Sequence, residues 1–227
     1  MNSAHPVSLR FPSLASFSNY VIRQLERCTP DITPLDETNV EKYICAALAR
    51  MMPILSAVRA FEAGKFDHLN SMQYSSFLFL LSNEIWLNEG TNDTSDKLFL
   101  LNRSLNSIDL YYKIRMPQVF VIAHGLGSVL VNTTYGENFV FFQNVTVGRL
   151  GDDVPTIGDN VVLFPNSMVL GNSIIGSNSV VSAGTVISNT HVPENSIVFA
   201  NGRELVIAES KKNYTGIFIR QERCNDD

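Results

Sequence analysis

The sequence predicts an α+β protein in which an N-terminal α-helical part precedes a parallel β-helix built from six-residue repeats. Three observations predict this fold class. Apolar residues recur at helical spacing in the first half, and they recur every six residues in the second half. The chain has 17 Lys and Arg and 22 Asp and Glu, yet only six of these charges lie between Met116 and Gly202. We therefore expect an α-helical domain at 1–107, a β-helix domain at 108–207 and a C-terminal tail at 208–227.

The first half predicts four helices. Their expected ranges are about 11–27, a helix that opens at 38 and runs to about 61, about 71–88, and one from 93 or 95 to about 106. Thr38 and Glu41 fit a capping box, in which each side chain bonds the other residue's backbone N–H. Pro53 predicts a kink in the second helix, and Gly64 and Gly90 follow expected helix ends.

The apolar faces of these helices predict a bundle with a shared core. The cluster Phe77, Phe79, Leu80 and Leu81 is the most apolar part of the bundle. It is typical of a buried core, and a contact between subunits is the alternative.

The second half predicts six-residue repeats from an unbroken series of aliphatic residues. Small or β-branched residues mostly stand four places after each of them. Between Val147 and Ile157 the step is ten residues instead of six, which predicts a loop at 149–155. The series is Ile157, Leu163, Val169, Ile175, Val181 and Ile187.

A period of six matches neither an α-helix nor a simple alternating strand. It suits a short strand followed by a corner, so that three repeats close one triangular coil. Successive coils would stack by parallel pairing about 4.8 Å apart. The aliphatic residue would fill the interior, and Asn and Gly would occupy the corners because they tolerate left-handed backbone.

Composition excludes several classes of function. A net charge of −5 without a basic cluster argues against nucleic-acid binding. No apolar run has the length of a membrane span, and the first residues lack the apolar core of a signal peptide. Cys28, Cys45 and Cys224 are expected to be free thiols in a cytoplasmic protein. The four histidines are scattered through the chain, so no metal site is expected.

Several motifs of the second half resemble the hexapeptide-repeat acyltransferases, and most closely their serine acetyltransferase branch. The resemblance covers about 109–207 and implies that the β-helix is left-handed. It also implies an enzyme that transfers an acetyl group from acetyl-CoA to a hydroxyl. The motifs are Ser107–Asp109, Ile122–Gly125, Phe142–Gly148, Val169–Asn172 and Val181–Val186.

The resemblance implies that His124 is the general base and that Asp109 orients it. An acceptor hydroxyl needs a base as it attacks the thioester, and imidazole has a suitable pKa. A carboxylate that accepts a hydrogen bond from the ring fixes its tautomer. Without the resemblance, His124 would be read as a structural histidine and Asp109 as a turn residue.

The resemblance also implies where acetyl-CoA binds. Ala183 and Gly184 match the small-residue segment along which the family places the pantetheine arm, although a simple β-helix corner explains them as well. Arg203, Lys211 and Lys212 follow the last coil and are candidates for the 3′-phosphate, or belong to a solvated end. The family builds its sites between adjacent β-helices, which implies a homotrimer or a multiple of it.

The acceptor is where the sequence departs from the serine acetyltransferase pattern. Ala123 replaces the usual Asp before the base, and Asp153 and Val154 replace the Arg-His pair that handles the amino acid. Asp152 and Asp153 would repel a carboxylate but can bond sugar hydroxyls, and Gln143 is assigned to the same acceptor side. We therefore expect a sugar of a surface polysaccharide or its precursor. Serine acetylation with a rearranged site, and a non-catalytic β-helix scaffold, are the alternatives.

Overall fold

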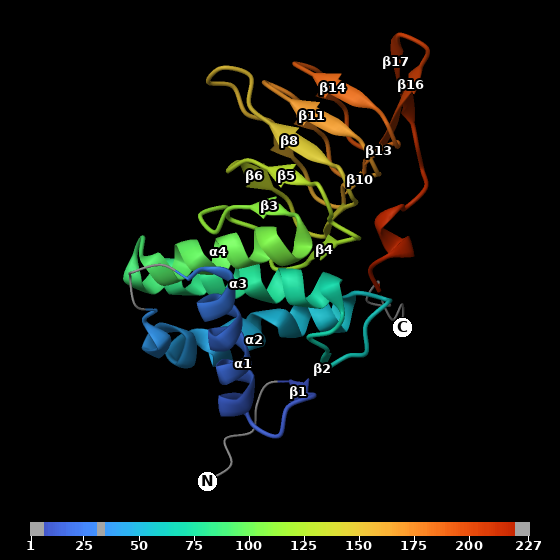
Figure 1. Cartoon of the computed structure of the whole chain (residues 1–227). Helices are drawn as coiled ribbons and strands as arrows, with labels where there is room; N and C mark the ends of the chain where they lie inside the picture. Colours follow the sequence, from blue (N-terminus) through green and yellow to red (C-terminus); the bar gives the residue numbers. More distant parts are fainter. Residues whose placement is uncertain (1–6, 31–34, 221–227) are drawn as a thin grey trace, which may run out of the picture.

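The computed structural model describes residues 7–30 and 35–220. It places four α-helices below a stack of β-coils (Figure 1). A short parallel pair, β1 (Ser8–Leu9) with β2 (Lys65–Phe66), lies beneath the helices. The helices are α1 (Leu14–Cys28), α2 (Glu37–Ala57), α3 (Ser71–Glu89) and α4 (Asp93–Asn106).

Side-chain caps fix where the helices begin. Ser13 Oγ accepts the Ser16 N–H at 3.1 Å, and Asn92 Oδ1 accepts the Ser95 N–H at 2.9 Å. The capping box predicted at Thr38 is wrong. Asp36 caps α2 instead, because its carboxylate accepts the Thr38 N–H at 3.1 Å as well as the Thr38 hydroxyl.

Helix α3 is the centre of the helical part. It is buried on nearly all sides, and polar residues on it such as Ser82 and Asn83 are buried with their side chains hydrogen bonded to backbone carbonyls. The cluster Phe77, Phe79, Leu80 and Leu81 is at most 3% exposed, which confirms that it belongs to the core and excludes it as a subunit contact. Phe79 meets Phe120 of the first β-coil edge to face at 5.9 Å, so the helical core continues into the β-helix.

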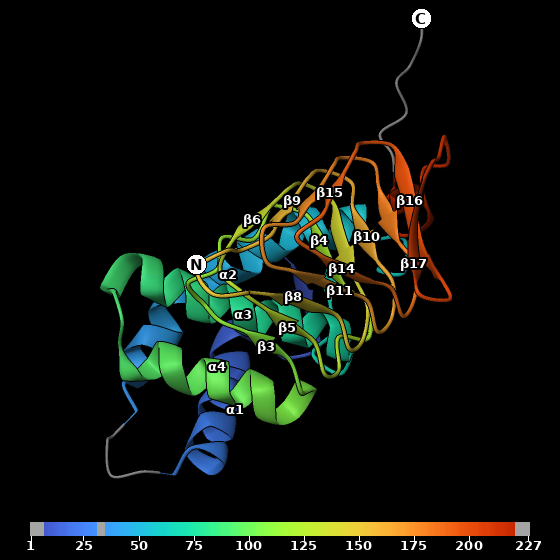
Figure 2. The same ribbon diagram turned by 90° about the horizontal axis from the view of Figure 1, so that it is seen from above.

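Three parallel sheets form the β-helix and surround its axis (Figure 2). The first sheet runs β4 (Phe120–Ile122), β7 (Phe139–Phe141), β10 (Val162–Leu163), β13 (Val180–Val181) and β16 (Ser196–Asn201), and β17 (Glu204–Glu209) adds to it antiparallel. The second runs β3 (Asp109–Leu110), β5 (Val129–Leu130), β8 (Thr146–Gly148), β11 (Met168–Leu170) and β14 (Val186–Ser188). The third runs β6 (Thr134–Tyr135), β9 (Thr156–Ile157), β12 (Ile174–Ile175) and β15 (His191–Val192).

The six-residue period is confirmed. Every aliphatic residue of the series from Ile157 to Ile187 is at most 1% exposed, and Leu163 pairs with Val181 of the coil above. The corners between sheets use left-handed asparagines, whose side-chain amides form ladders from coil to coil. One such ladder joins Asn138 to Asn160 at 2.9 Å and Asn160 to Asn178 at 3.0 Å.

The repeat shortens by one residue before the last strand of the third sheet. Ile174 pairs with His191 and Ile175 with Val192, so Val192 fills the interior while the His191 side chain is exposed. The rule that a small residue stands four places after each aliphatic residue therefore fails at His191, four places after Ile187. The step from Ile187 to the next interior residue is five, not six, and Thr190 takes the small-residue position.

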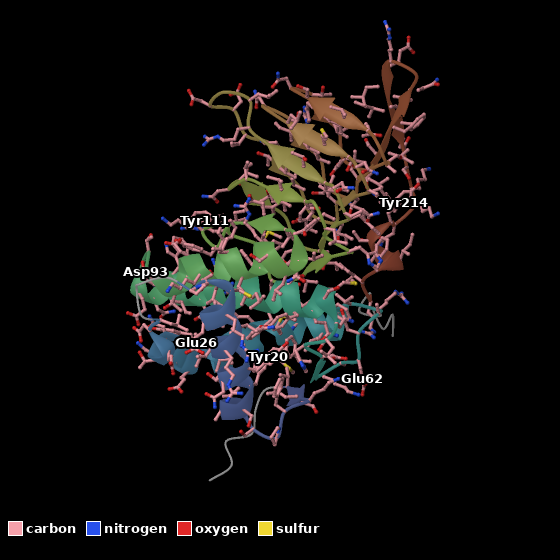
Figure 3. The ribbon with its side chains drawn as sticks, viewed as in Figure 1. Tyr20, Glu26, Glu62, Asp93, Tyr111 and Tyr214 are labelled. Carbon is pink, nitrogen blue, oxygen red and sulfur yellow. The ribbon has the colours of Figure 1, made fainter. Side chains whose placement is uncertain are left out.

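The chain then returns along the β-helix to the helices. We name residues 210–220 the C-terminal strap; Figure 3 shows its Tyr214 beside the coils, away from Tyr111. Phe218 packs edge to face on Phe142 at 5.3 Å, and the outer face of the first sheet is buried, with Val140, Val162 and Val180 at most 1% exposed.

Arg220 anchors the end of the strap on α2. Its guanidinium donates to the backbone carbonyls of Ser56 and Val58 at 2.7 Å, and its own N–H donates to Ala57 O at 2.7 Å. The last turn of α2 contains no basic residue, so Arg220 supplies the positive charge that favours a helix C-terminus.

Candidate active site

His124 lies on an extended corner of the first coil. From the interior residue Ile122 to the interior residue Leu130 the step is eight, whereas from Phe141 to Val147 it is six. Hydrogen bonds fix the alignment, because Asn144 N–H donates to Leu126 O at 2.8 Å. His124 and its neighbour Gly125 are therefore inserted relative to the regular corners.

The backbone of His124 is left-handed, with a φ of 56°. All other left-handed non-glycine residues of the β-helix are asparagines. A backbone conformation of this kind costs energy in most residues and is often retained at functional sites. Gly125 is required beside it, because a Cβ there would lie 2.4 Å from Ile122 Cγ2.

The extended corner faces the helical part across a pocket of about 110 Å³. Besides His124, the polar side chains that line it are Ser71 and Ser75 from the first turns of α3 and Asn106 from the end of α4. Leu105 and Leu126, also lining residues, are 45% and 57% exposed. The sequence contains no signal for these lining residues, because only the fold brings the start of α3 and the end of α4 to this corner.

Asp109 stands at the same end of the β-helix as His124, since β3 and β4 are the terminal strands of their sheets. Its carboxylate lies 3.6 Å from Arg103 Nη2 of α4, and Arg103 also lies over the Phe99 ring at 5.6 Å. Among residues 7–30 and 35–220, no hydrogen bond joins Asp109 to His124. The pairing of these two residues thus stays a prediction, and in this structure Arg103 is the ionic partner of Asp109.

The same edge of the β-helix carries three more of the predicted residues. The corners on this edge stack in the order Leu126, Gln143, Pro165 and Ala183, through the bonds Asn166 N–H to Gln143 O at 3.1 Å and Gly184 N–H to Pro165 O at 2.9 Å. Ala183 thus lies three coils, about 14 Å, above the corner of His124. Gly184 is left-handed, and a Cβ there would meet nothing within 4 Å.

Gln143 has a buried Oε1 atom without a hydrogen-bond partner among the described residues. Buried polar atoms are rarely left unpaired in a finished assembly. This oxygen is therefore an available acceptor at the level just above His124.

The other predicted residues lie elsewhere in the chain. Asp152 and Asp153 occupy an exposed loop between β8 and β9, closed by the bond from Leu150 N–H to Asp153 O at 3.1 Å. Arg203 lies at the exposed turn between β16 and β17. A single chain does not bring these three residues to the corner of His124.

In the described residues, the cysteines and the other possible metal ligands are dispersed and form no cluster. In the described part of the chain, no three His, Cys, Asp or Glu side chains form a group that could hold a metal ion. Cys28 and Cys45 are free and exposed, as predicted, and Cys224 lies outside the described residues. Within those residues, no helix is both long and apolar enough to cross a membrane.

Comparisons with known proteins agree with this architecture. Residues 155–189 match the family model of the bacterial transferase hexapeptide (six repeats). The chain resembles serine acetyltransferase from Brucella abortus strain S19, with a TM-score of 0.69 and 20% identity over 89% of this chain and 86% of that one. No curated protein sequence matches.

Two further solved structures extend the likeness. Serine acetyltransferase isoform 3 from Entamoeba histolytica, in complex with cysteine, has a TM-score of 0.60 and 23% identity over 90% of this chain and 76% of that one. A serine acetyltransferase in complex with CoA has a TM-score of 0.66 and 20% identity, with 84% and 83% covered. The chain therefore carries hexapeptide repeats and shares the fold of the serine acetyltransferases.

Proposed function

We propose that the protein is an acetyl-CoA-dependent O-acetyltransferase with His124 as general base and a sugar hydroxyl as acceptor. The observation that carries the proposal is the inserted corner at His124, which holds an imidazole in left-handed backbone at the mouth of a pocket. The regular corners on this edge keep a six-residue step, and the eight-residue step at His124 places a titratable side chain at the departure.

The chemistry assigned to His124 is a proton transfer. Its neutral imidazole takes the proton of the acceptor hydroxyl as that oxygen bonds to the thioester carbonyl carbon. When the carbon–sulfur bond breaks, the imidazolium returns the proton to the CoA sulfur. Asp109 would stabilise the imidazolium once its carboxylate turns from Arg103 toward the ring.

The donor assignment is supported by the edge above His124. Ala183 and Gly184 leave that edge open. On the second sheet beside it, Val129, Met168 and Val186 are exposed in one column, with Thr146 between Val129 and Met168. A neutral, narrow arm such as pantetheine fits such a surface, and one of the similar structures is a CoA complex. The same column is a suitable contact between subunits, and we propose a homotrimer that brings Asp152 and Asp153 of one chain to the base of another.

A sugar is the preferred acceptor because, among the described residues, no Lys or Arg side chain lines the His124 pocket. An amino acid carries a carboxylate, which is costly to bury without a cationic partner and which Asp152 and Asp153 of a second chain would repel. Hydroxyls of a sugar are neutral and match Ser71, Ser75 and Asn106. The second candidate, serine acetylation, is supported by the shared fold alone.

The test is release of CoA thiol from acetyl-CoA in the presence of L-serine, free sugars and nucleotide sugars. We expect turnover with a sugar, and His124→Ala should lower kcat by about 10²- to 10⁴-fold. His191→Ala is the matched control, since this exposed histidine lies on β15 of the third sheet. Turnover with L-serine alone would overturn the assignment of a sugar as acceptor. Unchanged turnover by His124→Ala would overturn the assignment of His124 as the base.

A further inference from the structure

A second pocket, of about 610 Å³, lies where three distant segments meet. The second half of α2 forms one wall, the start of the first coil forms another, and the C-terminal strap forms the third. It shares no lining residue with the pocket at His124. The sequence gives no signal for it, because its walls are more than 60 residues apart along the chain.

Among the described residues, this pocket presents no free charge. None of its described lining residues is Asp or Glu, and Arg220 is the one cationic side chain among them. The Arg220 guanidinium is already engaged by backbone carbonyls, those of Ser56 and Val58 at 2.7 Å and of Phe61 at 2.8 Å. A phosphate or a carboxylate would therefore find no uncommitted cation here.

The pocket does present an open amide acceptor. Along the ladder, Asn138 donates to Asn160 Oδ1, Asn160 to Asn178 Oδ1, and Asn178 to Asn195 Oδ1 at 3.3 Å. Asn138 is the first member of this ladder, and within the described residues nothing donates to its own Oδ1. The ladder thus ends at the pocket with one acceptor available.

A second amide stands beside this ladder end. Gln118 lines the pocket, and only its backbone N–H is engaged, by Glu137 Oε1 at 3.2 Å. Its exposed side-chain amide has no hydrogen-bond partner among the described residues. The pocket therefore offers both donors and acceptors on one side. Its apolar wall is formed by Pro53, Ala57, Val119 and Ile219.

We propose that this pocket binds a neutral, hydroxyl-rich ring compound, namely a hexose or N-acetylhexosamine unit of a short neutral oligosaccharide. Sugar hydroxyls donate and accept at once, which matches free amides, and the C–H faces of the ring can pack on the apolar wall. The absence of free charge favours a neutral ligand over an anionic one. The proposal concerns binding alone and holds whether or not His124 catalyses transfer.

The test is amide chemical-shift mapping of the full-length protein with maltotriose and with N,N′-diacetylchitobiose as probes. We expect at least one probe to shift the amide signals at 54–57, 118–119, 138 and 215–219 in a saturable manner. Shifts confined to 71–75 and 124–126, or no shift with either probe, would overturn the proposal.

Variants then test the two amides. Gln118→Ala should weaken binding by about three- to tenfold, the usual worth of one hydrogen bond. Asn138→Gly keeps the left-handed backbone and should do the same. Asn144→Gly is the matched control, because Asn144 has the same conformation and the same type of ladder bond, to Asn166 at 3.0 Å, on another edge. Equal binding by Gln118→Ala and the wild type, or equal loss in Asn144→Gly, would overturn the assignment.

Discussion

The corner that carries His124 differs from the three corners stacked above it on the same edge. The regular corners, 142–145, 164–167 and 182–185, have four residues and place Asn or Gly at the left-handed position. The corner at 123–128 has six residues and uses both Gly127 and His124 in left-handed backbone. Regular corners are explained by backbone geometry alone, whereas the extended one adds residues that stacking does not require. The comparison shows that four residues are enough to close a corner, whereas His124 and Gly125 are additional residues that the corner does not need for closure.

The largest effect is expected from making the extended corner regular. Replacing Ala123–Ser128 by Ser-Ala-Gly-Thr, the sequence of 182–185, removes the base and should abolish acetyl transfer. The coil should still close, because the new corner has the length and the left-handed glycine of its neighbours. Acetyl transfer and thermal unfolding of this variant check the prediction, and substantial remaining activity would show that the corner is not the site.

The strap is expected to have the next largest effect, through its anchorage on the end of α2. Arg220→Ala removes the guanidinium bonds to the end of α2 and should lower the free energy of unfolding by about 1–3 kcal/mol. Chemical denaturation measures it, with Arg203→Ala on the exposed hairpin turn as the control for a surface arginine. Equal stability of the two variants would contradict the anchoring role of Arg220.

A substitution at Gly125 tests the extended corner alone, since the regular corners have no residue that corresponds to it. Gly125→Ala places a Cβ against Ile122 and Ile108 and should cost about 1–2 kcal/mol of stability. The added Cβ would displace the backbone next to His124, so kcat should fall by more than the loss of stability explains. Gly184→Ala is the comparison variant, whose added Cβ meets open space but whose φ is 71°. A Gly125→Ala protein with wild-type kcat would show that the corner tolerates movement.

The smallest effect concerns a regular corner. Asn144→Ala forces an alanine into left-handed backbone, whereas Asn144→Gly keeps that conformation accessible. Both lose the bond to Asn166, so alanine should be less stable than glycine by about 1 kcal/mol. Paired thermal melts measure the difference, and a more stable alanine variant would contradict the geometric account of the corners.

Much of this fold can be predicted because the repeat constrains every coil in the same way. Interior aliphatic residues such as Leu163 and Val169 fix the register, and apolar periodicity places α3 and α4 nearly to the residue. The departure at His191 can be read from the sequence, because Val192 follows Ile187 by five residues. The N-cap of α2 is ambiguous from the sequence, since Thr38 and Asp36 are both residue types that cap helices well.

The rest depends on contacts between distant residues. Arg220 meets the end of α2 more than 160 residues away in the chain, and no local pattern announces that contact. The ion pair between Arg103 and Asp109 likewise follows from how α4 leads into β3. In the candidate site, the position of His124 could be predicted, but its neighbours Ser71, Ser75 and Asn106 could not.

We propose that His124 occupies the extended corner for its imidazole rather than for its backbone conformation. The most direct measurement compares His124→Asn with the wild type in acetyl transfer and in thermal unfolding. Asparagine accepts left-handed backbone, so Tm should stay within about 3 °C of the wild type, while kcat falls by about 10²- to 10⁴-fold. A His124→Asn protein that still transfers acetyl groups at the wild-type rate would contradict the claim.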